Sequence, residues 1–236
     1  MQKSFINCCF LLIFSSYFLI LGNAHGQVMS QVQQYQVDAF LKDVKFNDVK
    51  SVKKALADGM SPNAMDQKGN SALTIAITEK SLDVAKLLID SASIDLERPN
   101  LAGETPIMMA AFHGSFDLVQ YLIEKRQVEI NKPGWSALHY AATNGHLKIA
   151  TYLLDKNAYV DPESPNGTTA LMMAARGGHI EVVKLLLDRG ADLSKRNAVG
   201  MTAIDFAEQH NQSEIATGLK SRWLKLHKKA YRPLTK

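Results

Sequence analysis

One run of 27 residues, 167–193, constrains the fold of this chain more than any other part of it. Its sequence, GTTALMMAARGGHIEVVKLLLDRGADL, predicts two short antiparallel helices joined by a tight turn. In each half, apolar residues recur three and four positions apart, which places them on one helix face. Thr169 can cap the first helix, and Gly190 can end the second in the left-handed conformation. A single pair this short cannot bury its own apolar face, so it must stack on similar pairs.

The chain contains four further stretches that begin in the same way, at Gly69, Gly103, Gly134 and Gly200. With Gly167 included, the intervals between successive starts are 34, 31, 33 and 33 residues. A nearly constant period of this length indicates a stack of units in which each unit contacts mainly its neighbours. We therefore expect an all-α repeat solenoid.

The sequences that begin these units carry a family resemblance. GETPI at 103–107 and GWSALH at 134–139 are similar to the Thr-Pro-Leu-His-x-Ala start of ankyrin repeats. The chain thus resembles a small exported ankyrin-repeat protein of bacterial type over residues 37–224. The resemblance implies helix pairs joined by β-turn or hairpin loops, with an N-terminal cap near 37–65 and five full repeats. Those repeats are expected near 66–99, 100–131, 132–163, 164–196 and 197–224.

The same resemblance implies structural roles for four residues at the repeat starts. His139 stands where the family's histidine holds the turn between repeats with a hydrogen bond. Thr105 is expected to cap a helix, and Gly134 and Gly167 to form the opening turns.

The first 24 residues have the features of a secretory signal peptide. Lys3 precedes an apolar run of 12 residues, and small residues at 22 and 24 form a cleavage site. An uncleaved membrane anchor is the alternative, although this apolar stretch is short for a bilayer span. Both cysteines, Cys8 and Cys9, lie in this segment, so the mature chain would hold no thiol and no disulfide. We expect a periplasmic or secreted protein, with residues 25–36 as a flexible leader.

No catalytic constellation is recognisable in the sequence, so we do not expect an enzyme. GWSAL at 134–138 lacks the closing glycine of a nucleophile elbow, and no H-E-x-x-H zinc motif is present. Methionine pairs with nearby histidines could hold Cu(I), but methionine at a helix-packing position is commonly core filler. The residues concerned are Met108, Met109, Met172, Met173, His113 and His179. We expect no metal and no cofactor.

The candidate functional residues lie on the surface of the stack. In ankyrin proteins, partners usually contact the turn tips and the inner face of the first helices, so the resemblance places a partner at the variable positions there. These positions are Glu104, Phe112, Trp135, Asn144, Thr168, Arg176 and Met201. Phe112 and Trp135 are large aromatic residues outside the predicted apolar stripe, as interaction hot spots require. A local contact between adjacent turns is the alternative for these two.

The charge of the chain is divided unequally between its body and its C-terminal end. The whole chain carries +4, and removing Lys3 lowers this to +3. Setting aside the seven cations of residues 220–236 leaves the body at −4. The basic tail, residues 225–236, either improves solubility or contacts an anionic membrane or another polyanion. Its candidate contact residues are Lys225, Lys228, Lys229 and Arg232.

The leading expectation is an exported, monomeric, non-enzymatic scaffold that binds an unidentified protein through the concave ankyrin surface. A peripheral membrane or polyanion contact through the basic tail is the alternative function. Nucleic acid is not expected as a partner.

Overall fold

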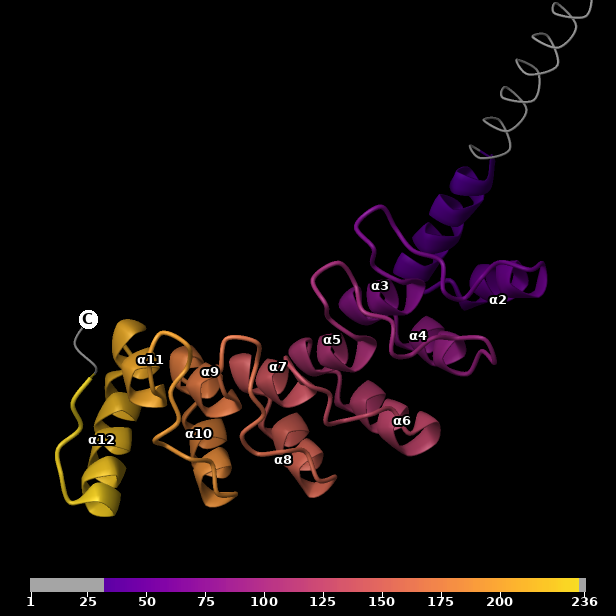
Figure 1. The fold of residues 1–236 in the computed structure, drawn as a ribbon. Coiled ribbons are helices and arrows are strands. Elements are labelled where there is room, and N and C mark those ends of the chain that lie inside the picture. The colour runs from indigo at the N-terminus through magenta and orange to yellow at the C-terminus, as the bar shows by residue number, and fades with distance from the viewer. Residues whose placement is uncertain (1–31, 234–236) are drawn as a thin grey trace, which may run out of the picture.

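The structure, a computed structural model, describes residues 32–233 as a curved stack of helix pairs (Figure 1). The predicted signal segment, residues 1–24, lies outside the described residues. The first pair consists of a helix through residues 32–45 and α2 (Val49–Ala57). Residues 32–36 are therefore helical, and residues 25–31 of the predicted flexible leader lie outside the described residues. The terminal pair packs on α4 through Ser81, whose hydroxyl donates to the carbonyl of Lys45 over 2.9 Å.

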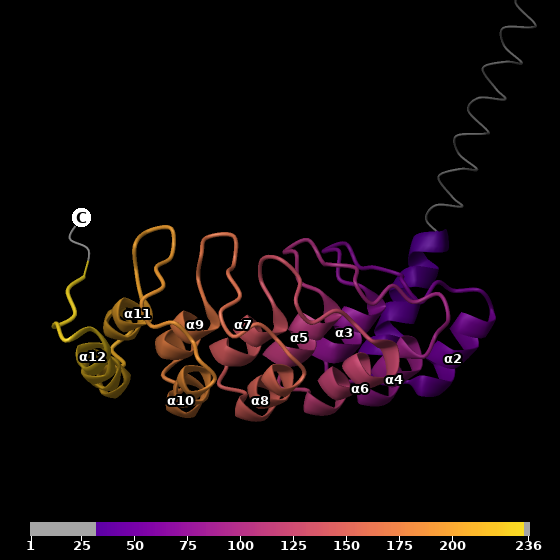
Figure 2. The ribbon, with the colours of Figure 1, turned by 60° about the horizontal axis from the view of Figure 1, so that its bottom comes forward.

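Five further pairs follow, each with a shorter inner helix and an outer helix packed behind it (Figures 1 and 2). They are α3 (Ala72–Thr78) with α4 (Leu82–Ile89), α5 (Pro106–Phe112) with α6 (Phe116–Arg126), α7 (Ala137–Thr143) with α8 (Leu147–Asp155), α9 (Ala170–Gly177) with α10 (Ile180–Asp188), and α11 (Ala203–Gln209) with α12 (Ser213–His227). The inner helices line the concave side, and the turns that precede them project on one side of the stack (Figure 2). This arrangement confirms the predicted all-α ankyrin-repeat solenoid.

The core is a continuous apolar layer between the two rows of helices. The outer helices α4, α6, α8 and α10 each contribute a leucine that is 0% exposed, namely Leu88, Leu122, Leu153 and Leu186. The inner helices carry alanine pairs such as Ala141-Ala142, also 0% exposed, which allow neighbouring helices to approach closely. Each unit is therefore stabilised mainly by the units on either side of it.

Several residues that recur from repeat to repeat have structural roles in the turns and at the helix starts. Gly134 and Gly167 have φ values of 90° and 71°, a backbone conformation that side chains other than glycine rarely adopt. The third residue of each of three inner helices accepts a hydrogen bond from the backbone N–H of its N-cap residue. The donor–acceptor distances are 3.5 Å to Met108 Sδ, 3.2 Å to His139 Nδ1 and 3.4 Å to Met172 Sδ. Met108 and Met172, two of the four methionines considered above as copper ligands, are therefore buried helix-start acceptors.

The C-terminal segment turns back after α12 and packs on α11 (Figure 1). Tyr231 joins its hydroxyl to that of Thr202 over 2.8 Å and also donates to the carboxylate of Asp205. Helix α12 ends at His227, so Lys225 belongs to its last turn. Among residues 32–233, no helix combines the length and the apolar character needed to cross a bilayer.

Candidate partner-binding face

Three aromatic side chains form a continuous strip on the inner row of helices. Phe112 ends α5, Tyr140 lies in the middle of α7, and Trp135 lies in the turn before α7. The ring centroid of Tyr140 is 6.0 Å from that of Phe112 and 6.3 Å from that of Trp135, and both pairs meet edge to face. All three side chains are partly exposed. We call these three residues the aromatic strip.

Hydrogen bonds hold the strip in one conformation. Tyr140 donates from its hydroxyl to Glu104 Oε1 over 3.0 Å, and Asn100 donates to the other carboxylate oxygen over 2.8 Å. Burial of Tyr140, together with the neighbouring Glu104 carboxylate, raises the pKa of this phenol well above its usual value of 10.0. Tyr140 is therefore a neutral hydrogen-bond donor with a fixed ring position. Asn144, at the end of α7, donates to the carbonyl of Phe112 over 2.8 Å and ties the far end of the strip to the neighbouring repeat.

Trp135 is also a packing residue, which the sequence did not indicate. Its ring lies 5.1 Å from that of the buried His139 and packs against the hydrophobic core. The prediction that Trp135 lies outside the residues holding the stack together is wrong, because the turn folds over the start of α7. Its remaining exposed part borders Tyr140.

Thr168 is a second correction to the predicted binding residues. It is only 3% exposed, its backbone N–H donates to Ser164 Oγ, and its carbonyl accepts from His139 Nε2 over 2.9 Å. Thr168 therefore links two repeats and presents little surface to a partner. His139, 0% exposed, makes this link from the preceding repeat, and its burial lowers its pKa below the usual 6.5.

The other predicted residues are distributed along the inner face of the stack. Arg176 is exposed at the end of α9, and Met201 is partly exposed in the turn before α11. The basic residues Lys225, Lys228, Lys229 and Arg232 are all exposed at the C-terminal end. In residues 32–233, no group of three or more His, Cys, Asp or Glu side chains is arranged to hold a metal ion.

Tyr140 is the member of the strip that the sequence reasoning missed. The signal that could have found it is its place in the repeat, directly after His139 and equivalent to Met109 and Met173. One turn of helix separates this position from the variable position at the helix end, so both lie on the same face. A prediction built on the helix ends and the turn tips alone leaves out the residue between them.

A hollow of about 580 Å³ extends the inner face from the strip toward the N-terminus. Glu104 and Met109 from the second repeat meet Ile75 and Thr78 from the first repeat along it. Its walls carry both charges, including an ion pair of 3.0 Å between Lys45 and Glu79. The face therefore changes from apolar at the strip to charged at the hollow.

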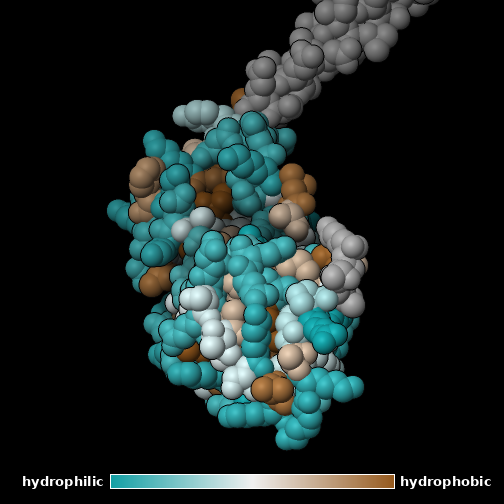
Figure 3. Space-filling model, turned by 90° about the vertical axis from the view of Figure 1, so that its left-hand side faces the viewer, coloured by the Kyte–Doolittle hydropathy of each residue, from teal (hydrophilic) through white to brown (hydrophobic). Residues whose placement is uncertain are grey.

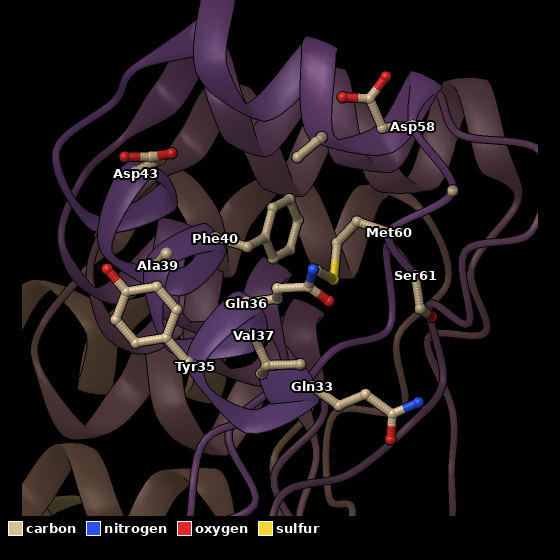
Figure 4. Close-up of a pocket in the computed structure, with 12 residues that line it drawn as sticks. Gln33, Tyr35, Gln36, Val37, Ala39, Phe40, Asp43, Asp58, Met60 and Ser61 are labelled. Carbon is tan, nitrogen blue, oxygen red and sulfur yellow. The ribbon is translucent and has the colours of Figure 1, made fainter. Parts of the chain in front are cut away.

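A second hollow of about 650 Å³ lies at the N-terminal end of the stack, between the helix of residues 32–45 and the loop that follows α2. Phe40, Val37 and Met60 line it, and the amide of Gln36 lies beside them (Figure 4). None of the aromatic strip lines this hollow, so the two are separate features.

Comparison with known proteins agrees with the repeat architecture. A family profile described as "Ankyrin repeats (3 copies)" matches residues 40–133, 93–164 and 157–228. An ankyrin repeat protein of Rickettsia felis is 29% identical over 146 residues, which is 60% of this chain and 62% of that protein. The Rattus norvegicus protein "Ankyrin repeat and SAM domain-containing protein 6" is 32% identical over 112 residues, or 46% of this chain and 12% of that protein. This chain thus spans only a small part of the rat protein.

A solved complex contains a chain of similar fold. It is the complex of the Bd0816 predatory endopeptidase from Bdellovibrio bacteriovorus with immunity protein Bd3460. The matched chain is the immunity protein, with 29% sequence identity and a TM-score of 0.67. The match covers 78% of this chain and 97% of that one.

Proposed function

Because this chain belongs to the ankyrin-repeat family, we propose that it is a protein-binding scaffold whose partner docks on the aromatic strip. The observation that carries the proposal is the position of three touching aromatic rings, partly exposed, on the inner row of helices. Interaction hot spots are enriched in tyrosine and tryptophan and cluster near the centre of an interface. The strip lies in the second and third of five full repeats, close to the middle of the stack.

The rigidity of the strip favours binding. Tyr140 is held by Glu104 and both neighbouring rings, and Trp135 is held by His139. Side chains that are already ordered lose less conformational entropy when a partner arrives, so more of the contact energy contributes to affinity. Phe112 is the member of the strip best suited to substitution. It ends α5, and Asn144 bonds to its backbone carbonyl, which a substitution of the side chain leaves in place.

We propose further that the partner is an enzyme, which this chain would bind without being an enzyme itself. The support is the similarity to immunity protein Bd3460, which is solved in complex with an endopeptidase. At 29% identity this similarity supports a similar mode of action.

Export of the protein is part of the proposal and rests on the sequence of residues 1–24 alone. The mature chain should begin near residue 25 or 27, which N-terminal mass spectrometry of exported protein measures. An intact Met1 on a membrane-bound species would contradict export with cleavage.

The alternative function, contact with a membrane or polyanion, is supported by the exposed cations at the C-terminal end. Residues 220–233 contain six lysines and arginines and no acidic residue. Binding to vesicles containing phosphatidylglycerol should then fall steeply with salt and disappear on removal of residues 228–236. Vesicle binding that is absent at low salt would exclude this alternative.

Photocrosslinking from the strip tests the principal proposal. A benzoylphenylalanine at position 112 should form an adduct with one protein in the native compartment. The same group at Tyr159, which is 67% exposed and lies in a loop after an outer helix, is the matched control and should not trap that protein. Equal adducts from both positions, or adducts from position 159 alone, would show that the strip is not the docking surface.

A further inference from the structure

One position of the outer helices departs from the pattern of the preceding repeats. The residue just before the buried leucine of each outer helix is Leu87, Tyr121, Tyr152 and Leu185 in α4, α6, α8 and α10. All four are partly buried and pack against the core. Two of them reach back to the preceding repeat, since Tyr121 donates to Asp90 over 2.7 Å and Tyr152 to Glu124 over 3.0 Å. In α12 this position is occupied by Gly218.

The absence of a side chain at Gly218 leaves room between the last two outer helices. A Cβ atom built on Gly218 would meet no heavy atom within 4 Å. A groove of about 390 Å³ lies here between α10 and α12. Its apolar lining comes from both helices: Ile180, Val183 and Leu187 from α10, and Ile215 and Leu219 from α12. The groove thus occupies the place that a leucine or tyrosine fills in the earlier repeats.

The edge of this groove is cationic. Lys184, Arg222 and Lys225 line it with one acidic residue, Glu214, and Lys184 also pairs with Glu181 over 2.9 Å. Arg222 is held there by a hydrogen bond of 3.3 Å to the carbonyl of Leu187. The positive charge continues beyond the groove, because Lys228, Lys229 and Arg232 are exposed at the same end of the stack. Figure 3 shows this end as a largely hydrophilic surface with small apolar patches between the polar side chains.

We propose that the groove between α10 and α12 docks an acidic amphipathic helix of a partner protein. The shape of the groove supports this, because the space can hold one bulky apolar side chain of a partner. Two neighbouring helices also form the kind of groove in which the apolar face of a third helix binds. The charge supports it because the cationic edge attracts acidic flanking residues and repels basic ones. The surface lies on the outer row of helices, so it is distinct from the aromatic strip.

The test uses the full chain and a labelled synthetic peptide. The peptide forms a helix with leucines along one face and glutamates beside them, and binding is measured by fluorescence anisotropy. Wild-type protein should bind it, and Gly218→Leu should weaken binding at least tenfold, since leucine is what α4 and α10 carry at this place. The open space around Gly218 means that this variant folds, and an unchanged circular dichroism melt verifies that it does.

Charge variants provide the matched control. Lys184→Glu should weaken binding at least fivefold, whereas Lys86→Glu should not. Lys86 has the same place on α4 as Lys184 on α10, but Tyr121 of the following helix α6 fills the position that Gly218 leaves open in α12. Failure of the peptide to bind wild-type protein at millimolar concentration would overturn the proposal. Equal binding by Gly218→Leu, or equal binding of a peptide with lysines in place of the glutamates, would also overturn it.

Two further measurements separate this surface from other possibilities. Binding of phosphatidylglycerol vesicles that is lost in Gly218→Leu, with no binding of the peptide, would assign the groove to lipid and contradict a helix as its occupant. Phe112→Ala should leave peptide binding unchanged, because the aromatic strip lies on the other row of helices. Loss of peptide binding in Phe112→Ala would place the peptide on the strip and overturn the assignment to the groove.

Discussion

Replacement of His139 by methionine should weaken the junction between the third and fourth repeats. It should also remove most of the pH dependence of the stability of that junction. His139 is fully buried, accepts from the Ser136 N–H through Nδ1, and donates from Nε2 to the Thr168 carbonyl in the next repeat. Methionine is the matched residue, since Met108 and Met172 occupy the same position and accept the equivalent N–H. His139→Met therefore keeps an acceptor for the Ser136 N–H at the helix start. It loses the link to Thr168, the 3.0 Å contact of Nδ1 with Ser136 Oγ, the ring contact with Trp135 and the titrating group.

The size of the destabilisation at neutral pH depends on which hydrogen bonds the Thr168 carbonyl keeps in the variant. It still accepts from the backbone N–H of Ser164 over 3.1 Å, so it is not left without a partner. The variant should then lose at least the net value of one hydrogen bond, about 0.5–1.5 kcal/mol of unfolding free energy. For a domain of this size, about 0.5–1.5 kcal/mol corresponds to a fall in Tm of roughly 1–6 °C.

The pH dependence has a definite sign. Burial holds the pKa of His139 below 6.5 in the folded chain, so the folded state disfavours the protonated form. The stabilisation is fully present above the unfolded pKa and is lost as the pH falls from there toward the folded pKa, by up to about 1.4 kcal/mol per pH unit for one proton. Burial also lowers the pKa of His113, which therefore adds a pH dependence of the same sign to the stability of both the wild-type protein and His139→Met.

Thermal unfolding followed by circular dichroism at pH 7.5 and 5.5 measures both effects. The wild-type protein should lose more stability on acidification than His139→Met does, and the two melting curves should approach each other at pH 5.5. An equal pH shift in both proteins would refute the buried, neutral role of His139. A variant as stable as wild type at pH 7.5 would refute the link to Thr168.

Three other predictions concern stability. Leu186→Ala, at a fully buried position of α10, should cost about 2–5 kcal/mol, and hydrogen exchange should show the C-terminal repeats loosening before the N-terminal ones. Tyr231→Phe removes the hydroxyl that joins the C-terminal segment to Thr202 and Asp205. Hydrogen exchange in α11 should therefore rise while α3 to α7 stay protected. Unchanged exchange in α11 would show that this contact contributes nothing to the stability of the last repeat. Trp135→Ala should lower the unfolding free energy by about 2 kcal/mol because the half-buried ring packs on the core, and a melt identical to wild type would show that the ring belongs to the surface alone.

The repeat units could be predicted because their signals are local. Glycine at a positive φ, a polar helix cap and apolar residues three and four positions apart all act within one unit, and Gly134 and Gly167 show how the backbone requires them. The bounds of the first helix could not be predicted, because a terminal unit lacks the glycine start and residues 33–36, QQYQ, are glutamine-rich. The return of the C-terminal segment also escaped prediction, since it depends on a contact between Tyr231 and Asp205, 26 residues apart.

The binding face was only partly predictable for a related reason. The variable positions located Phe112 and Trp135, but the sequence could not show that Trp135 would reach the ring of His139 or that Thr168 would be buried. Both outcomes depend on how the turn of one repeat rests on the next, which is a contact between units. Periodicity gives the face of a helix on which a residue lies, and the stacking geometry decides how much of that residue remains exposed.

The affinity of the recovered partner for Phe112→Ala tests the central claim most directly, with Tyr159→Ala as the control. Both variants remove one exposed or partly exposed aromatic side chain, and only Phe112 belongs to the strip. Phe112→Ala should leave the melting curve nearly unchanged and weaken binding about thirtyfold, equivalent to about 2 kcal/mol. Tyr159→Ala should bind as the wild-type protein does. Undiminished binding by Phe112→Ala would contradict docking of the partner on the aromatic strip.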